Sequence, residues 1–305
     1  MSKIPLQIAA AGSVADHSTP LAARHSPKKL PRADSSDLPA IAESYIQAAT
    51  AASTRRNFAS DLRHLAFHGI SVESEPAAVL EYLAKFGGIH AVGTLERRMI
   101  SLHKAAKQLG TPSVAKHTSV SSAIKGIKRT HGSRPRRVTA VVKDTLLEML
   151  ICAEQKQKPM AHARDKALLL MAFCGALRRS EVTALEVTDI TFLTTGMDVL
   201  IRRSKTDAEG NGETIFLPRA KGTRCPVQAL KDWLASACIT EGSIFRAVTR
   251  GDRVLADALS AQSVALIVKR AATRIGANAD QFSGHSLRAG FCTEASTAGL
   301  ANWQI

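Results

Sequence analysis

The sequence predicts a mainly α-helical protein of two domains with a small β-hairpin or sheet in the second, so the expected fold class is α+β. Its 305 residues suffice for two domains that each bury an apolar core. Apolar residues recur at helical spacing along most of the chain, and a glycine-containing turn separates two short β-type runs. Together these observations favour helices packed around one small sheet.

The first domain is predicted to span residues 37–132 and to be all helical, behind a flexible tail at residues 1–36 that is rich in Ser and Pro. The second, third and fourth helical patterns stop at glycines, and Ser53 or Thr54 is the expected cap of the second. The patterns cover 38–48, 53–69, 76–87 and 95–110, and a basic segment around Ile124 follows them.

The second domain is predicted to span residues 133–305, with Gly132–Arg137 as the interdomain linker. Its β-type runs are Asp198–Arg203 and Glu213–Leu217, and the residues between them have the composition of a hairpin turn. Helical patterns cover 143–154, 161–177, 260–275 and 284–298, and the second of these is apolar nearly all round, which predicts burial.

Composition excludes several classes of protein. The longest apolar stretch, Ala167–Leu177, has eleven residues, well short of the roughly 18 that a membrane span needs. Five cysteines without a C-x-x-C pair indicate neither a disulfide framework nor a cysteine-based zinc site, and we expect a cytoplasmic protein.

Positive charge is concentrated in one part of the chain. Lys and Arg total 41 against 26 Asp and Glu, a net charge of +15. The segment from Arg97 to Lys143 carries twelve basic residues and no acidic one. A solvated charged face usually mixes both signs, so this segment favours a phosphate-backbone partner. The candidate DNA-binding residues are Arg97, Arg98, Lys104, Lys107, Lys125, Lys128, Arg129, Arg134, Arg136 and Arg137.

Three short constellations could carry chemistry. The first, Gly175–Leu185, joins the end of an apolar helix to Arg178, Arg179 and Glu181. The second places Lys205 at the end of a β-run, just before the hairpin turn. The third is His285-Ser286-Leu287-Arg288, in which the first and last residues share one helical face. Each also has an ordinary structural reading, as a helix C-cap, a solvated lysine or a chance match.

In this order, and behind a basic helical domain, the three constellations resemble the tyrosine recombinase or phage integrase family. Gly175, Leu177, Arg178 and Glu181 match one family box, Lys205 matches the hairpin lysine, and His285, Leu287 and Arg288 match the H-x-L-R box. The resemblance covers residues 38–305 and implies a helical core-binding domain followed by a catalytic domain. The double arginine leaves the register open between Arg178 and Arg179.

The resemblance implies site-specific DNA recombination or integration, in which strands are cleaved and rejoined through a phosphotyrosine intermediate. Arg178 and Arg288 would hold the phosphate oxygens, since guanidinium groups bind two oxygens and stay charged. His285 would donate a hydrogen bond or manage a proton, Lys205 would protonate the departing oxygen, and Glu181 would orient its neighbours. No metal or other cofactor is implied, and double-stranded DNA is the expected partner.

The family nucleophile is the one expected group that the sequence lacks. No tyrosine follows Tyr82, so we expect a C-terminally incomplete catalytic domain that binds DNA but is inactive alone. The alternative is a non-catalytic remnant or regulator that occupies recombination sites. Tyr45 and Tyr82 lie on helices of the other domain, as core or interface residues, and Trp303 is expected in the core. A homotetramer on DNA and a monomer in free solution are both compatible with the resemblance.

Overall fold

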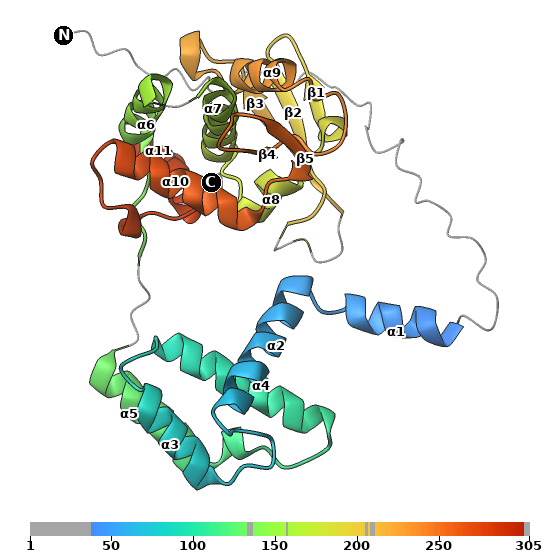
Figure 1. Ribbon diagram of the computed structural model, residues 1–305, viewed down its shortest axis with the longest axis vertical. Coiled ribbons are helices and arrows are strands. Elements are labelled where there is room, and N and C mark those ends of the chain that lie inside the picture. The colour runs from blue at the N-terminus through green and yellow to red at the C-terminus, as the bar shows by residue number, and fades with distance from the viewer. Residues whose placement is uncertain (1–37, 133–136, 157, 205–206, 208–210, 302–305) are drawn as a thin grey trace. The chain divides into compact units, whose positions relative to one another are not determined.

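The structure is a computed structural model that describes residues 38–132, 137–156, 158–204, 207 and 211–301 (Figure 1). The chain forms two compact units, Met1–Arg134 and Pro135–Ile305. Helices dominate both, and the strands are confined to two small antiparallel sheets in the second unit. The predicted fold class is therefore confirmed. The predicted tail, most of the predicted linker and Trp303 lie outside the described residues.

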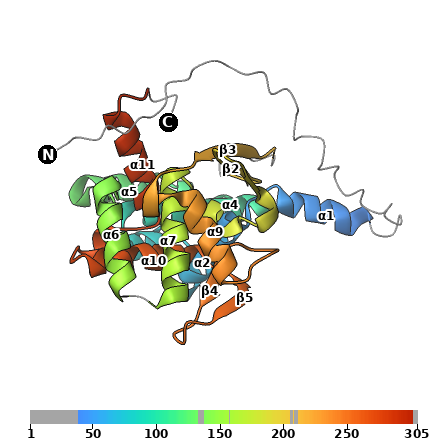
Figure 2. The same cartoon turned by 90° about the horizontal axis from the view of Figure 1, so that it is seen from above.

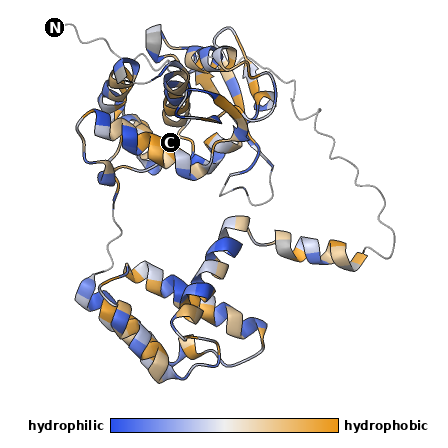
Figure 3. Cartoon of the chain, in the orientation of Figure 1, coloured by the Kyte–Doolittle hydropathy of each residue, from blue (hydrophilic) through white to orange (hydrophobic). Residues whose placement is uncertain are grey.

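The first unit consists of helices whose apolar residues recur every three or four positions. On α3, the residues Val79, Tyr82, Leu83 and Phe86 are buried together. Figure 3 shows hydrophobic and hydrophilic residues sharing these helices, as amphipathic helices require. The helices are α1 (Leu38–Ala48), α2 (Ala52–Phe67), α3 (Pro76–Phe86), α4 (Val92–Gln108), the 3-10 turn η3 (Val114–Lys116) and α5 (Thr118–His131).

The start of α2 differs from the prediction. The helix begins at Ala52, and Ala51 occupies the cap position without a side-chain hydrogen bond, so Ser53 and Thr54 lie inside the first turn. Tyr45 on α1 is 62% exposed, whereas Tyr82 is buried at 4%. Of the two tyrosines, only Tyr82 is a core residue.

Charged and polar groups enter the core of the first unit. Asp61 is buried and accepts hydrogen bonds from Arg97 Nη2 at 2.8 Å and Ser101 Oγ at 2.9 Å. Arg98 is also buried, and its Nη1 donates to the Tyr82 hydroxyl at 2.9 Å. These bonds partly compensate the cost of taking two charges out of water.

A cluster of aromatic rings lies beside these charges. The His64 ring lies 4.7 Å from that of His68 and 5.7 Å from that of His90, and Phe86 stacks on His90 at 4.9 Å. Burial, and then the charge of Arg98, lowers the pKa of His64 and of His90 below the ordinary histidine value. The neutral form of both rings is therefore the form that this core favours.

The second unit is built around the helix α7 (Pro159–Cys174). This helix lies between α6 (Lys143–Lys156) and α9 (Pro226–Ser236) in both views (Figures 1 and 2). Its residues 167–172 are all buried, which confirms the burial that its sequence predicted. The rest of the helices are α8 (Arg179–Ala184), α10 (Ala261–Arg274) and α11 (His285–Thr297), with 3-10 turns η4 (Val187–Asp189), η5 (Gly222–Arg224) and η6 (Ala279–Gln281).

The larger sheet contains the hairpin that the sequence predicted. Strands β2 (Gly196–Ile201) and β3 (Glu213–Pro218) pair antiparallel with Val199 opposite Ile215, and β1 (Ile190–Phe192) pairs along the other edge of β2. The sequence prediction did not include β1, α9 or the second hairpin of β4 (Arg246–Val248) and β5 (Val254–Ala258). Three-residue strands are too short to show an alternating pattern.

The first residues of the second unit are attached to its last helix. Val141 N donates to Ser286 O at 2.8 Å, and Lys143 N donates to the Glu294 carboxylate at 2.9 Å. A side chain at Gly290 would overlap the backbone of Val141, so only glycine permits this close approach. Among the described residues, none of the helices combines the length and apolarity needed to cross a bilayer.

Candidate active site

Arg178 is held at the start of α8 by a buried carboxylate. The backbone N of Arg178 donates to Glu181 Oε2 at 2.8 Å, and its Nη1 donates to Glu181 Oε1 at 2.7 Å. The Glu181 side chain is 5% exposed and that of Arg178 is 22% exposed. Glu181 thus accepts the backbone N–H at the start of the helix and orients the Arg178 guanidinium. The remaining N–H groups of this guanidinium are available to bind an anion.

Arg288 reaches the turn that precedes Arg178 from the far end of the unit. Its Nη1 donates to the carbonyl oxygen of Ala176 at 2.6 Å, across 112 positions of sequence. Ala176 has a φ of 47°, a left-handed conformation that is costly for a residue with a side chain. The structure therefore brings the two predicted phosphate-binding arginines to one turn.

Arg179 has a different environment from Arg178. Its aliphatic stem lies against Gly284, where an added Cβ would overlap Arg179 Cγ and Cδ. This packing connects the start of α8 to the residue that precedes α11. The contacts distinguish the two arginines, since Arg178 is oriented by a carboxylate and Arg179 by packing. They favour Arg178 as the residue of the family box, although its catalytic assignment stays a prediction.

His285 is exposed at the first position of α11, three residues before Arg288. Its backbone N donates to Ser283 Oγ at 3.1 Å, and Ser283 N donates to Ser286 Oγ at 3.0 Å. These short-range bonds fix the turn that starts the helix. His285 and Arg288 consequently lie on one helical face.

Lys205 lies outside the described residues, in the connection between β2 and β3. The base of this connection is held firmly by Arg202, which pairs with Glu186 at 2.8 Å and with the buried Asp189 at 2.6 Å. Hydrogen bonds to both carboxylates help to raise the pKa of Arg202 above its usual value, against the opposing effect of burial. The strand end that leads to Lys205 is therefore anchored beside α8.

One cysteine lies next to these groups and is a poor nucleophile. Cys174 is the last residue of α7, directly before Gly175. Burial raises the pKa of its thiol to about 11. A thiol with this pKa is almost fully protonated at neutral pH, and the thiolate is the reactive form.

The predicted DNA-binding residues divide into exposed and buried groups. Arg98 is corrected here, because it is 8% exposed and its guanidinium is bonded to Tyr82 inside the core. Two of the exposed residues pair with acids from outside the acid-free segment, Arg97 with Asp61 and Lys128 with Glu96. Arg134 and Arg136 lie outside the described residues. The exposed members of the set are Arg97, Lys104, Lys107, Lys125, Lys128, Arg129 and Arg137.

No group of three or more His, Cys, Asp and Glu side chains is arranged to hold a metal ion in the described part of the chain. The chemistry that the turn offers is cationic. The Arg288 guanidinium donates to the carbonyl of Ala176, two residues before Arg178, whose own guanidinium is bonded to Glu181. The helix that carries Arg288 begins with the exposed imidazole of His285. This set can bind the oxygens of a phosphodiester and stabilise the added negative charge of its transition state.

The chain belongs to the phage integrase family, which matches residues 141–302. It is thus a tyrosine recombinase by family, a class that acts in DNA recombination. The chain is similar to an integrase/recombinase xerD homolog from Selenomonas ruminantium. The two are 35% identical over 234 residues, which cover 75% of this chain and 68% of the relative.

Solved structures share the fold. A XerH site-specific recombinase bound to palindromic difH substrate aligns with a TM-score of 0.52 at 18% identity, over 72% of this chain and 61% of that one. The chain thus spans about three fifths of the length of that recombinase. A lambda integrase tetramer bound to a Holliday junction aligns with a TM-score of 0.56 at 13% identity, over 88% of this chain and 74% of that one.

Proposed function

We propose that the second unit binds the scissile phosphate of a recombination site in double-stranded DNA. Arg178 and Arg288 hold the non-bridging oxygens, His285 donates a hydrogen bond or manages a proton, and Lys205 protonates the departing 5′-oxygen. The contact of Arg288 with Ala176 at 2.6 Å carries this proposal, since it joins two residues that the sequence separates. Glu181 acts through Arg178, as a positioning residue.

We propose further that the first unit contacts the DNA backbone. Its exposed cations on α4 and α5 suit phosphate contacts that carry no sequence information. Arg98 is not one of them, because it is buried against Tyr82. If these cations and the second unit together contact roughly six to ten phosphates, the affinity should fall by about 10³ to 10⁵ between 50 and 200 mM salt. A protein of this kind works in the cytoplasm, on the nucleoid.

The third part of the proposal is that the 305-residue chain binds DNA without forming a covalent adduct by itself. Both tyrosines belong to the first unit, where Tyr82 is buried and bonded to Arg98. The protonated Cys174 thiol does not replace them. Without an activated hydroxyl at the phosphate, the positioning groups remain but the covalent intermediate does not form.

A second candidate function is a regulator that occupies recombination sites without cutting them. Such a regulator would need only groups that hold the DNA phosphate, and Arg178 and Arg288 supply them. The recombinase and the regulator would bind DNA at the same arginines, and only the recombinase would form a covalent bond to the DNA. Assembly is also open to test, and we expect a monomer in free solution that gathers as four protomers on two duplexes.

The test begins with a duplex that the purified chain itself selects from a random library. Gel mobility shifts at several salt concentrations measure affinity, and Arg178→Ala or Arg288→Ala should weaken binding by about tenfold or more. Arg253→Gln is the matched control, because it removes an exposed positive charge from the connection between β4 and β5, which contributes no residue to the Ala176 turn. Affinity that is independent of salt, or equal in all three variants, would contradict the phosphate assignment.

The second step distinguishes the recombinase from the regulator. The selected duplex is nicked, incubated with the chain and analysed by denaturing electrophoresis for protein attached to DNA. We expect no adduct from the 305-residue chain, and an adduct after a tyrosine-bearing C-terminal extension is added. An adduct mapped to Tyr45 or Tyr82 would overturn the mechanism, whereas an extended chain that binds but never reacts would establish the regulator.

A further inference from the structure

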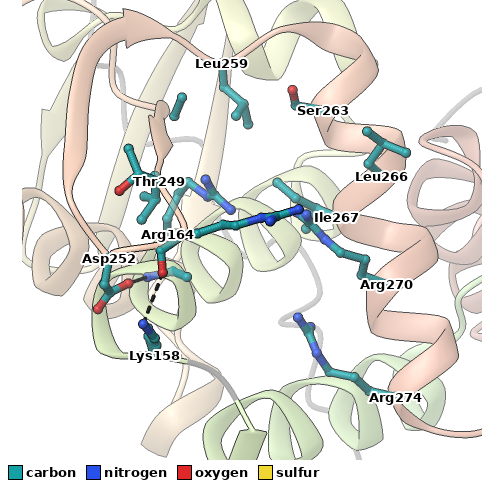
Figure 4. A pocket seen from close by; sticks show the side chains of 14 residues that line it. Lys158, Arg164, Thr249, Asp252, Leu259, Ser263, Leu266, Ile267, Arg270 and Arg274 are labelled. Carbon is teal, nitrogen blue, oxygen red and sulfur yellow. Dashed lines mark hydrogen bonds between the residues drawn. The ribbon is translucent and has the colours of Figure 1, made fainter.

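A cationic pocket of about 350 Å³ lies in the second unit, apart from the Ala176 turn (Figure 4). It is formed by the start of α7, the β4–β5 hairpin and one face of α10. Arg178, Glu181, His285 and Arg288 are not part of its lining. Its charged lining consists of Lys158, Arg164, Arg250, Arg270, Arg274 and a single carboxylate, Asp252.

The carboxylates near this pocket already have other partners. Asp252 Oδ2 and Oδ1 accept the backbone N–H groups of Met160 and Ala161, each at 3.0 Å, and so cap the start of α7. Asp165, on the same helix, accepts two hydrogen bonds from Arg164, at 2.9 and 2.6 Å. Both carboxylates are therefore already bonded to groups of α7.

Arg270 and Arg274 lie one turn apart on α10, and Figure 4 shows both reaching toward the pocket that Arg164 lines from α7. Within the described ranges, no hydrogen bond or ion pair holds either guanidinium. Like charges at this spacing repel. Burial lowers the pKa of Arg274 from its ordinary value, the nearby Asp165 opposes this shift, and the neighbouring Arg270 adds to it. A bound anion would relieve this repulsion.

Arg164 adds a fixed positive charge. It is 5% exposed, and its two bonds to Asp165 use Nε and Nη2. Its side chain is therefore oriented before any ligand arrives, which lowers the entropy cost of binding. A buried guanidinium facing two unpaired ones is a set of planar donors that suits phosphate oxygens.

Apart from Thr249 and Ser263, the uncharged lining of the pocket is apolar, and this favours a phosphate that carries an apolar group. Val248, Leu259 and Ile267 line the pocket, together with Leu266, which is 48% exposed. The volume lies at the low end of the roughly 300–1,000 Å³ typical of small-ligand sites. A phosphate that carries a planar or apolar group would fill both the cationic and the apolar parts.

We propose that this pocket binds the phosphate group of a nucleotide, either free or within a DNA strand. Arg270 and Arg274 contact the phosphate, Arg164 supplies the fixed charge, and the apolar wall takes the sugar or base. This proposal is independent of DNA cleavage at the Ala176 turn. It concerns binding alone, and the pocket residues differ from those of the turn.

The test uses the full 305-residue chain and adenosine monophosphate as the probe, with titration calorimetry as the measurement. We expect saturable binding that Arg270→Gln and Arg274→Gln each weaken by about tenfold, since each removes a charge-assisted contact. Lys269→Gln is the matched control, because it removes the same charge from the same helix outside the pocket lining and should leave the affinity unchanged. Circular dichroism checks that each variant is folded.

Two competitors identify the source and the class of the ligand. If a short duplex displaces the nucleotide, the pocket lies on the DNA path, and if it does not, the ligand is a free nucleotide. Loss of nucleotide affinity in the α10 variants, with DNA affinity retained, separates this site from the Ala176 turn. No nucleotide binding, equal binding by the α10 variants, or tighter binding of a triaspartate peptide would overturn the proposal.

Discussion

The two units of the chain differ in the size of their apolar cores, although both bury charged side chains. The second unit has a large apolar core that includes Trp233, Phe245 and residues 167–172 of α7, and its buried charges are Arg164, Asp165, Glu181 and Asp189. The first unit has a smaller apolar cluster, in which buried Asp61 and Arg98 lie beside the partly buried ring of His64. An apolar core is sensitive to lost volume, whereas a buried polar cluster is sensitive to lost partners and to pH.

The largest expected effect is a cavity in the second unit. Trp233 is fully buried and its Nε1 donates to Ile244 O at 2.9 Å. Trp233→Ala should lower the free energy of unfolding of this unit by about 3–5 kcal/mol. Urea unfolding followed by circular dichroism measures this change. Leu255→Ala, at a 40% exposed residue, is the control and should shift the same transition little.

The next effect is a lost polar partner in the first unit. Tyr82→Phe removes the hydroxyl that accepts from buried Arg98, and should cost about 1–3 kcal/mol. Tyr45→Phe makes the same chemical change at a 62% exposed residue and should cost less than about 0.5 kcal/mol. Thermal unfolding of both variants checks the contrast. Equal effects would mean that burial of Arg98 does not depend on the hydroxyl.

The third prediction concerns pH. The pKa values of His64 and His90 are lower in the folded state than in the unfolded chain, so the unfolded state binds more protons. The two histidines therefore leave the stability of the first unit unreduced above the ordinary histidine pKa of roughly 6.5. The stability falls as the pH drops below that value and through the lower pKa values of the folded state. Urea midpoints measured between pH 7.5 and 5 should show this fall.

His162 in the second unit has a pKa lowered chiefly by burial, so that unit should lose some stability over the same range. The double change His64→Gln and His90→Gln isolates the contribution of the first unit. Its transition should lose most of its pH dependence, while that of the second unit stays as it was. If the transition of the first unit keeps its pH dependence after both substitutions, His64 and His90 are not the source of that dependence.

The smallest effect concerns salt. Lys125 is exposed on α5, and Lys125→Gln should reduce the slope of log affinity for DNA against log salt by about 0.9. Arg98→Gln removes the same charge from the core and should leave this slope unchanged while destabilising the first unit. Mobility shifts at four salt concentrations measure both slopes. A reduced slope for Arg98→Gln would return that residue to the DNA-binding set.

Most of the helices, although not α9, could be predicted from the sequence because apolar residues spaced three and four apart form one buried face. Arg98 shows the limit of a charge run, since Arg97 and Arg98 are neighbours in sequence but project about 100° apart on α4. The sequence of this basic segment gives the number of its charges but not which side chains reach the surface. Asp61 and Glu96, which pair with Arg97 and Lys128, lie outside residues 97–143. The net positive charge near this segment is therefore smaller than its own composition suggests.

The candidate site was predictable in its residue types but not in its contacts. Family boxes pointed to Arg178, Glu181 and Arg288, yet no pattern indicates that a backbone carbonyl at Ala176 receives Arg288. The cationic pocket was also missed, because its arginines come from α7, the β4–β5 hairpin and α10, with ordinary spacing in each. Such sites depend on tertiary packing, which local periodicity does not encode.

The attachment of Val141 and Lys143 to α11 has a consequence for synthesis of the protein. The backbone N–H groups of Val141 and Lys143 can form these hydrogen bonds only after Ser286 and Glu294 have been synthesised. At roughly 5–20 residues per second, the ribosome needs about 8 to 30 s to make the residues between Lys143 and Glu294. The first unit is complete before this interval begins, so it can fold during translation while the second stays open. During this interval the apolar residues of α6 and α7 lack their partners in α10 and α11 and can be bound by a chaperone.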